Sequence, residues 1–190
     1  MFLVPRIRGA TPKDNKELLS LFDIASGGFV YQVFAQTAPR GVPVEDYIIA
    51  RMGSSDSGLS YANLWVCEVD GEVAGLIALE KTADKDELVS PDNQGMFQPI
   101  IELTNMAPGC CNINLLATFP KFRGRKAGLA LMEFAETQRG ANGLSLTVGD
   151  TNLAAQGFYQ HLGFRFVARR KVIKDEWKTP YSEWLLMVKD

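Results

Sequence analysis

The strongest constraint on this fold is an Asp70-Gly71 dipeptide between two strand-like runs, Leu64–Val69 and residues 72–79. Asp-Gly is favoured in two-residue turns because both turn positions need a positive φ, which suits the twist of paired strands. The sequence therefore predicts an antiparallel β-hairpin over residues 64–79.

A later region alternates strands with helices. An apolar run over residues 111–118 and an alternating run over 144–148 predict two strands. The helical pattern between them, over 127–139, ends before Gly140. Together with the hairpin, this order predicts the α+β class, with a single mixed, mostly antiparallel central sheet flanked by helices.

The remaining elements are less sharply marked. Residues 26–36 are ambiguous between helix and loop, and residues 81–111 are expected to be a loop and helix elaboration before the central strand. We expect a single domain over residues 1–190. The other expected elements are strands over 4–8, 164–168 and 184–188, helices that begin at Pro12 (capped by Thr11) and at Pro43, a helical turn over 99–103 and a helix over 152–162.

Composition argues against several classes of function. A net charge of −2 gives no electrostatic case for binding nucleic acid or a membrane. Cys67, Cys110 and Cys111 fit neither a disulfide framework nor a zinc site, and a single histidine, His161, makes a metal site unexpected. This cysteine usage predicts a reducing, cytoplasmic compartment. The apolar start is too short for a signal peptide or a membrane span.

A basic, glycine-containing segment over residues 119–128 follows the 111–118 strand and opens the next helix. The first N–H groups of a helix lack internal partners and lie at the positive end of its dipole, so a pyrophosphate suits this turn. The turn does not end in the Gly-Lys-Ser/Thr of a P-loop, and its late position does not fit a dinucleotide-binding fingerprint. The alternative is a solvated surface turn.

A second pattern lies on the helix over 152–162. Asn152 and Tyr159 are seven residues apart and therefore point in nearly the same direction, with Ala155 and Gln156 on the same face. Small residues beside a tyrosine leave room for a ligand and offer it a hydroxyl. The alternative is a core aromatic whose hydroxyl bonds to the backbone.

Together the two segments resemble the GNAT superfamily of N-acetyltransferases. Residues 123–128, Arg-Gly-Arg-Lys-Ala-Gly, are similar to its pyrophosphate-binding motif, Arg/Gln-x-x-Gly-x-Gly/Ala, with Lys126 in place of the first glycine. Residues 152–164 are similar to its second motif, Asn-x-x-Ala-x-x-x-Tyr-x-x-x-Gly-Phe. The resemblance covers roughly residues 6–189 and implies the acyl-CoA N-acyltransferase fold.

The resemblance also implies acetyl-CoA as the acyl donor. The strand before the turn would bind its pantetheine arm, and the N–H of Leu116 would polarise the thioester carbonyl. Asn152 would contact the donor, and Tyr159 would protonate the departing thiolate. The implied donor-binding residues are Leu116, Ala117, Thr118, Arg123, Gly124, Arg125, Lys126, Ala127, Gly128, Leu129, Asn152, Ala155 and Tyr159.

Direct attack on the thioester requires a neutral amine. An alkylammonium with a pKa of ~10.4 is neutral in about one molecule in 2,500 at pH 7, a deficit of ~4.6 kcal/mol. Glu102 is the first candidate for a general base, with Glu80 and Asp150 as further candidates, and each is otherwise a surface carboxylate. The amide of Asn114 is limited to orienting a water molecule.

Three functions stay open on the sequence. The first is an N-acetyltransferase for a primary amine of a small molecule or peptide. The others are a non-catalytic acetyl-CoA-binding sensor or regulatory module, and a protein that binds ATP or NAD at the basic turn. A covalent route through Cys110 or Cys111 is not expected, because no histidine or cation stands beside them.

The acceptor side is the least constrained. Phe29, Tyr31 and Phe34, with the loop over 81–103, are predicted to form the acceptor pocket; the alternative is ordinary packing and a solvated loop. The acceptor, the acyl length and the oligomeric state do not follow from the sequence. A homodimer through residues 184–188, taken as an edge strand, stays open.

Overall fold

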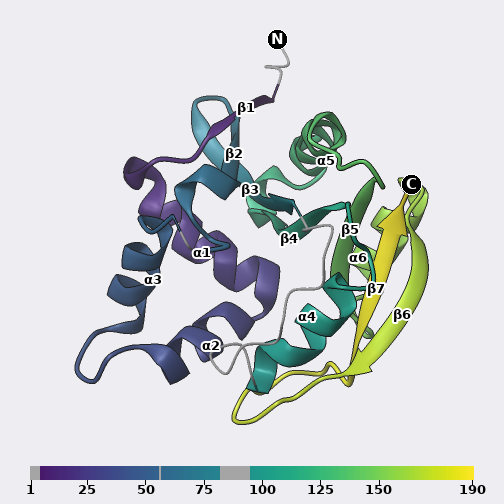
Figure 1. Cartoon of the computed structure of the whole chain (residues 1–190). Helices are drawn as coiled ribbons and strands as arrows, with labels where there is room; N and C mark the ends of the chain where they lie inside the picture. Colours follow the sequence, from purple (N-terminus) through teal and green to yellow (C-terminus); the bar gives the residue numbers. More distant parts are fainter. Residues whose placement is uncertain (1–4, 56, 82–94) are drawn as a thin grey trace. The chain divides into compact units, whose positions relative to one another are not determined.

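The structure is a computed structural model of the 190-residue chain, and it describes residues 5–55, 57–81 and 95–190 (Figure 1). Seven strands form one mixed sheet in the order β1-β2-β3-β4-β5-β7-β6. The strands are β1 (Arg6–Gly9), β2 (Leu64–Val69), β3 (Glu72–Lys81), β4 (Cys111–Thr118), β5 (Leu144–Gly149), β6 (Arg165–Lys171) and β7 (Glu183–Lys189). The α-helices are α1 (Asn15–Ser26), α2 (Phe29–Thr37), α3 (Val44–Met52), α4 (Gln98–Thr104), α5 (Ala127–Thr137) and α6 (Leu153–His161). The α+β class and the mixed sheet are confirmed.

The chain divides into two compact units. Unit 1 comprises residues 1–79 and 114–137, and unit 2 comprises residues 80–113 and 138–190. β4 contributes to both, because its residues 111–113 belong to unit 2 and the rest belong to unit 1. The single domain over 1–190 stays a prediction. Residues 82–94, most of the predicted loop before the central strand, lie outside the described part of the chain.

The predicted hairpin is confirmed in unit 1. β2 and β3 pair antiparallel from Leu64 opposite Ala78 to Val69 opposite Glu72. Between them Asp70 has φ 57° and Gly71 has φ 80°, the left-handed conformations that a two-residue turn requires.

The ambiguous segment over 26–36 is largely helical, since α2 spans Phe29–Thr37. Its buried side chains are Phe29, Val30 and Val33, spaced so that they share one face of the helix. α2 packs on α1 and α3 within unit 1. Tertiary burial therefore decides a segment whose local sequence, with two glycines before it, does not.

An ion-pair network joins β1, β2 and the turn before α1. Arg8 donates to both carboxylate oxygens of Asp14 at 2.8 Å and, through Nε, to Glu68 at 2.8 Å. The backbone N–H of Thr11 also donates to Asp14 at 2.8 Å. Because these donors favour the ionised form, led by the bond from Arg8, the pKa of Asp14 is lowered to about 2.

Unit 2 is built on β5, β7 and β6. β7 pairs antiparallel with β5 on one side and with β6 on the other. The expectation that residues 184–188 form an edge strand is therefore wrong, because both backbone edges of β7 are used; β6 is the edge strand. α4 packs across β5, β6 and β7 (Figure 1).

Among the described helices, none is by itself long and apolar enough to cross a membrane. Pro12–Ser26 and Phe29–Thr37, taken as a pair bent by 109°, meet that test by length and composition only.

Replacing Asp14 with Asn should lower the free energy of unfolding at pH 7 by about 2 kcal/mol, the energy of the pKa shift. The folded pKa lies below the unfolded value of 3.8, so this contribution is present above pH 3.8 and disappears as the pH falls towards 2. Urea unfolding of both proteins between pH 7 and 2 measures it. Curves that differ equally at both ends would refute the electrostatic origin.

Candidate active site

The predicted pyrophosphate turn joins β4 to α5 in unit 1. After Thr118 the chain makes one short 3₁₀ turn over Pro120–Phe122, and Gly124 then takes φ +74°. Phe122 is buried and anchors the turn, with the cationic groups of Lys121 and Arg125 at 4.8 and 5.5 Å from its ring centre.

Two of the four cations in the turn are ion-paired to the hairpin. Arg125 pairs with Asp70 and Lys121 pairs with Glu72, both in unit 1. Because their partners neutralise them, these side chains offer less charge to a ligand, and as exposed pairs they add little to the stability of the turn.

The other two cations, Arg123 and Lys126, are exposed and make no ion pair among the described residues. The N–H groups of Ala127, Gly128 and Leu129 donate to no carbonyl within the part of the chain that the structure describes. Free N–H groups at a helix start beside free cations are what a pyrophosphate requires, so these residues fit the phosphate end of a CoA molecule.

Lys126 is held in a conformation that favours glycine. Its φ is +64°, a region that side chains with a Cβ adopt at a cost of roughly 1 kcal/mol. The backbone at this position therefore has the shape that the motif glycine would take, although the residue is lysine. The substitution adds a charge and strain and leaves the turn intact.

The predicted pantetheine segment lies at the end of β4. Ala117 is buried, while Leu116 and Thr118 are half-buried. A Cβ on Gly75 of β3 would stand 2.5 Å from the carbonyl oxygen of Ala117, so only glycine permits this approach. The ladder between β4 and β5 comprises three residue pairs and ends at Ile113 opposite Leu146, before β4 enters unit 1.

The second motif forms α6 in unit 2. Asn152 caps the helix, because its side-chain oxygen accepts the N–H of Ala155 at 3.2 Å. Tyr159 is 8% exposed, and its ring packs against Phe158 and Phe164 at centroid distances of 5.5 and 5.7 Å.

The Tyr159 hydroxyl makes no hydrogen bond to any described residue. Burial raises its pKa, so it is protonated at neutral pH. The alternative of a core tyrosine bonded to the backbone therefore finds no partner in the described chain. Tyr159 is thus a buried, protonated residue whose hydroxyl is not engaged by any described residue and is free to donate a hydrogen bond to a ligand.

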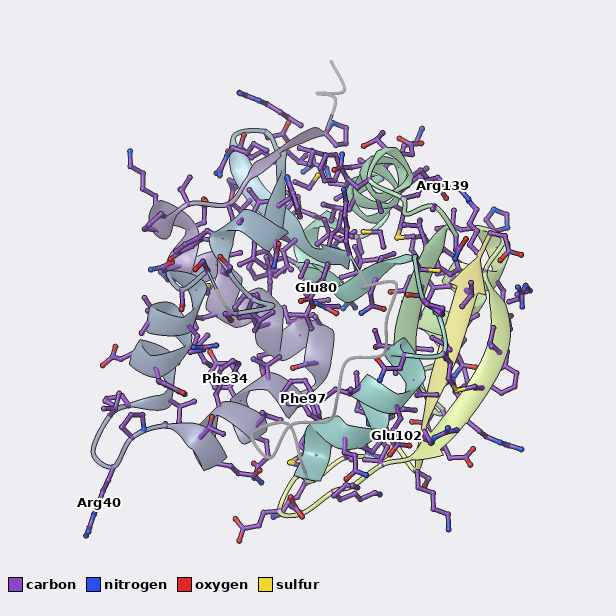
Figure 2. All side chains as sticks on the ribbon, viewed as in Figure 1. Phe34, Arg40, Glu80, Phe97, Glu102 and Arg139 are labelled. Carbon is purple, nitrogen blue, oxygen red and sulfur yellow. The ribbon has the colours of Figure 1, made fainter. Side chains whose placement is uncertain are left out.

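The three candidate carboxylates are all engaged. Figure 2 labels Glu102 on α4. Glu102 accepts from Arg170 of β6 at 2.8 Å and from Gln98 at 3.1 Å, and these bonds, Arg170 first, lower its pKa. Asp150 accepts the N–H of Ser182 at 3.0 Å. Glu80, labelled in Figure 2, is the penultimate residue of β3, and its charge helps to raise the pKa of Cys111. A general base stays a prediction.

The cysteines are placed as small interior residues. Cys67, Cys110 and Cys111 are buried and unpaired with one another. Burial raises the pKa of each thiol, for Cys67 to about 11, which makes them poor nucleophiles at neutral pH. Among the described residues, no group of three or more His, Cys, Asp or Glu side chains is placed to hold a metal ion.

The predicted acceptor aromatics are packed inside unit 1. Phe29 is buried, the Tyr31 hydroxyl donates to the carbonyl of Leu19 at 3.4 Å, and Phe34 meets Tyr47 edge-on at 5.8 Å. Figure 2 labels Phe34 on α2. These contacts favour the packing alternative, and an acceptor role stays a prediction.

The sequence model of the acetyltransferase (GNAT) family matches residues 29–164, a range that contains both motifs. The chain belongs to this family. It is therefore an acyltransferase, of a family that uses acetyl-CoA. No curated protein matches it by sequence.

Solved structures share the fold of this GNAT protein. An N-acetyltransferase from Staphylococcus aureus Mu50 is 20% identical, with a TM-score of 0.62 over 97% of this chain and 100% of its own. Naa50 of Arabidopsis thaliana, solved with a CoA bisubstrate analogue, is 14% identical, with a TM-score of 0.57 over 99% of each chain. A ribosomal-protein alanine N-acetyltransferase from Escherichia coli is 15% identical, with a TM-score of 0.55 over 97% of this chain and 92% of its own. At these identities the likeness shows the fold alone.

Sequence reasoning missed the residues that hold the two motifs in place. Asp70 and Glu72 were assigned only to the hairpin, yet they pair with cations more than 45 residues away in the chain. Gln156 was placed on the ligand-facing side of α6, but its amide turns back to bond the turn before the helix. The acidic hairpin and the basic turn were a charge-pairing signal available in the sequence.

Replacing Lys126 with Gly should raise the free energy of unfolding by about 0.5 kcal/mol, because relief of the left-handed strain exceeds the added entropy of the unfolded chain. Replacing Lys126 with Ala removes the same charge but keeps the strain, so it serves as the matched control and should bring no gain. Chemical denaturation measures both. Equal stability of the two variants would contradict the strain assignment.

Proposed function

We propose that this GNAT protein transfers an acetyl group from acetyl-CoA to a primary amine of a small molecule or a peptide by direct attack. The observation that carries the proposal is the start of α5, where three consecutive free N–H groups lie beside two unpaired cations inside the matched family range. Structural neighbours support the amine class, since they include a ribosomal-protein alanine N-acetyltransferase and an agmatine N-acetyltransferase.

In this proposal, two groups of residues bind the acetyl-CoA donor. Arg123, Lys126 and the N–H groups of residues 127–129 hold the pyrophosphate, while Leu116–Thr118 bind the pantetheine arm through their backbone, with Asn152 and Ala155 as further contacts. Acetyl-CoA supplies the activated acyl group as a thioester.

Tyr159 acts as the general acid. A thiol has an ordinary pKa of ~8.5, so the departing thiolate takes up a proton at pH 7. The raised pKa of Tyr159 keeps it protonated at that pH and also makes it a weak acid. Because a thiolate leaves readily, the contribution belongs near the lower end of general acid catalysis, about 10²-fold.

The amine must lose a proton before it attacks. Glu102 is ionised at neutral pH, but its lowered pKa makes it a weak proton acceptor, and its ion pair with Arg170 occupies one of its oxygens. The proposal therefore does not depend on Glu102, and a water chain and a desolvating pocket are the other routes to the neutral amine, whose deficit is ~4.6 kcal/mol.

Replacing Tyr159 with Phe should leave acetyl-CoA affinity unchanged in calorimetry and lower kcat about 10²-fold, because only the proton donor is lost. ATP and NAD serve as parallel ligands and should not bind. Absence of acetyl-CoA binding by the unaltered protein would overturn the donor assignment. Full turnover by Y159F would instead overturn the role of Tyr159 alone.

Replacing Glu102 with Gln should change kcat less than threefold at pH 7 and leave the acid limb of the pH–rate profile in place, since the ion-paired carboxylate is a poor base. Steady-state rates between pH 5.5 and 9 measure this. A tenfold or larger loss of kcat together with loss of the acid limb would make Glu102 the base after all.

A further inference from the structure

The turn that leads from β5 into α6 is hydrogen-bonded both to the segment that begins β7 and to α6. Two hydrogen bonds join the turn to the residues at the start of β7. The N–H of Ser182 donates to Asp150 Oδ1 at 3.0 Å, and the N–H of Asp150 donates to the carbonyl of Glu183 at 3.0 Å. These reciprocal bonds join two segments of unit 2 that are more than 30 residues apart in the chain.

The other bonds to the turn come from α6 itself. The amide Nε2 of Gln156 donates to the carbonyl of Gly149 at 3.0 Å and to that of Asp150 at 2.9 Å. Gln156 lies one turn inside the helix, so these two bonds oppose rotation of α6 about its axis relative to the end of β5.

An aromatic cluster packs against the same turn. The Tyr181 ring lies on Gly149 so closely that a Cβ there would stand 2.5 Å from the ring. Tyr181 also contacts Trp177 and Trp184, whose rings stack at 5.8 Å with an interplanar angle of 14°. The segment that carries Ser182 is thus anchored by buried aromatic packing and is not a free loop.

Tyr159 depends on this arrangement for its direction. Its hydroxyl has no hydrogen-bond partner among the described residues, so nothing at the tip of the side chain holds it. Its place is set by ring packing and by the rotation of α6, on which Gln156 precedes it by three residues.

We propose that Asp150, held by Ser182 and linked through the turn to Gln156, is a positioning residue that sets the rotation of α6 and thereby aims the Tyr159 hydroxyl. The proposal rests on the acyl transfer proposed above. It gives Asp150 the role of a hydrogen-bond acceptor, in place of the general base that its position after β5 suggests. The negative charge is not required for this role; an oxygen at the Oδ1 position is.

A matched pair of variants separates these roles. Asp150→Asn keeps the oxygen that accepts the Ser182 N–H and removes the charge, while Asp150→Ala removes both. Each variant is measured by steady-state kinetics from pH 5.5 to 9, by acetyl-CoA titration, and by hydrogen exchange of the peptide over residues 153–161 in the ligand-free protein.

We expect Asp150→Asn to stay within about twofold of the unaltered protein in kcat and to keep its pH profile. We expect Asp150→Ala to lose about tenfold in kcat, to keep the KM for acetyl-CoA within about twofold, and to exchange its α6 amides about tenfold faster. A separate Gln156→Glu variant should reproduce the loss in kcat, because it removes the two donors at nearly constant size.

Other outcomes overturn the proposal. Equal loss in Asp150→Asn and Asp150→Ala, with a shifted acid limb, would mean that the carboxylate itself takes part in proton transfer. Unchanged exchange in Asp150→Ala would mean that the bonds do not restrain α6. The exchange measurement needs no acyl donor. It therefore still tests whether the Asp150 and Gln156 hydrogen bonds restrain α6 if the protein fails to turn over acetyl-CoA and the proposed function is wrong.

Discussion

The close approach of Gly75 to Ala117 is the constraint on which the donor side depends. A Cβ on Gly75 would meet the Ala117 carbonyl oxygen at 2.5 Å, so β3 and the end of β4 reach this spacing only with glycine. The N–H of Phe119 then donates to the Ala74 carbonyl at 2.9 Å and carries the contact one step beyond the strand. The segment predicted to bind pantetheine and the turn that follows it are thus both positioned by β3.

The four cations of the turn divide into two that are ion-paired and two that are exposed. Arg125 and Lys121 are held by the hairpin acids, while Arg123 and Lys126 remain exposed. Lys126 accepts a left-handed conformation that glycine would adopt without cost. Each paired cation contacts an acid of the hairpin, and the buried Phe122 ring lies beneath both.

In unit 2, a tyrosine suited to proton donation is placed by its surroundings and not by a bond to its own hydroxyl. Burial keeps Tyr159 protonated, and aromatic neighbours hold its ring. The helix that carries it is fastened at its first turn by Asn152, Gln156 and Asp150. The hydroxyl stays available to a ligand, because no described residue bonds it.

The sequence by itself determined the local elements and the family. The Asp70-Gly71 turn, the 111–118 strand and the Asn152 cap follow from backbone preferences that act within a few residues, and the two motifs carry their chemistry at short spacing. Only the tertiary structure decided that residues 29–37 are helical, that β7 lies inside the sheet, and that Asp150 and Glu102 are bound to Ser182 and Arg170. Each of these depends on contacts between segments far apart in the chain, whose pairing energy local sequence patterns do not encode.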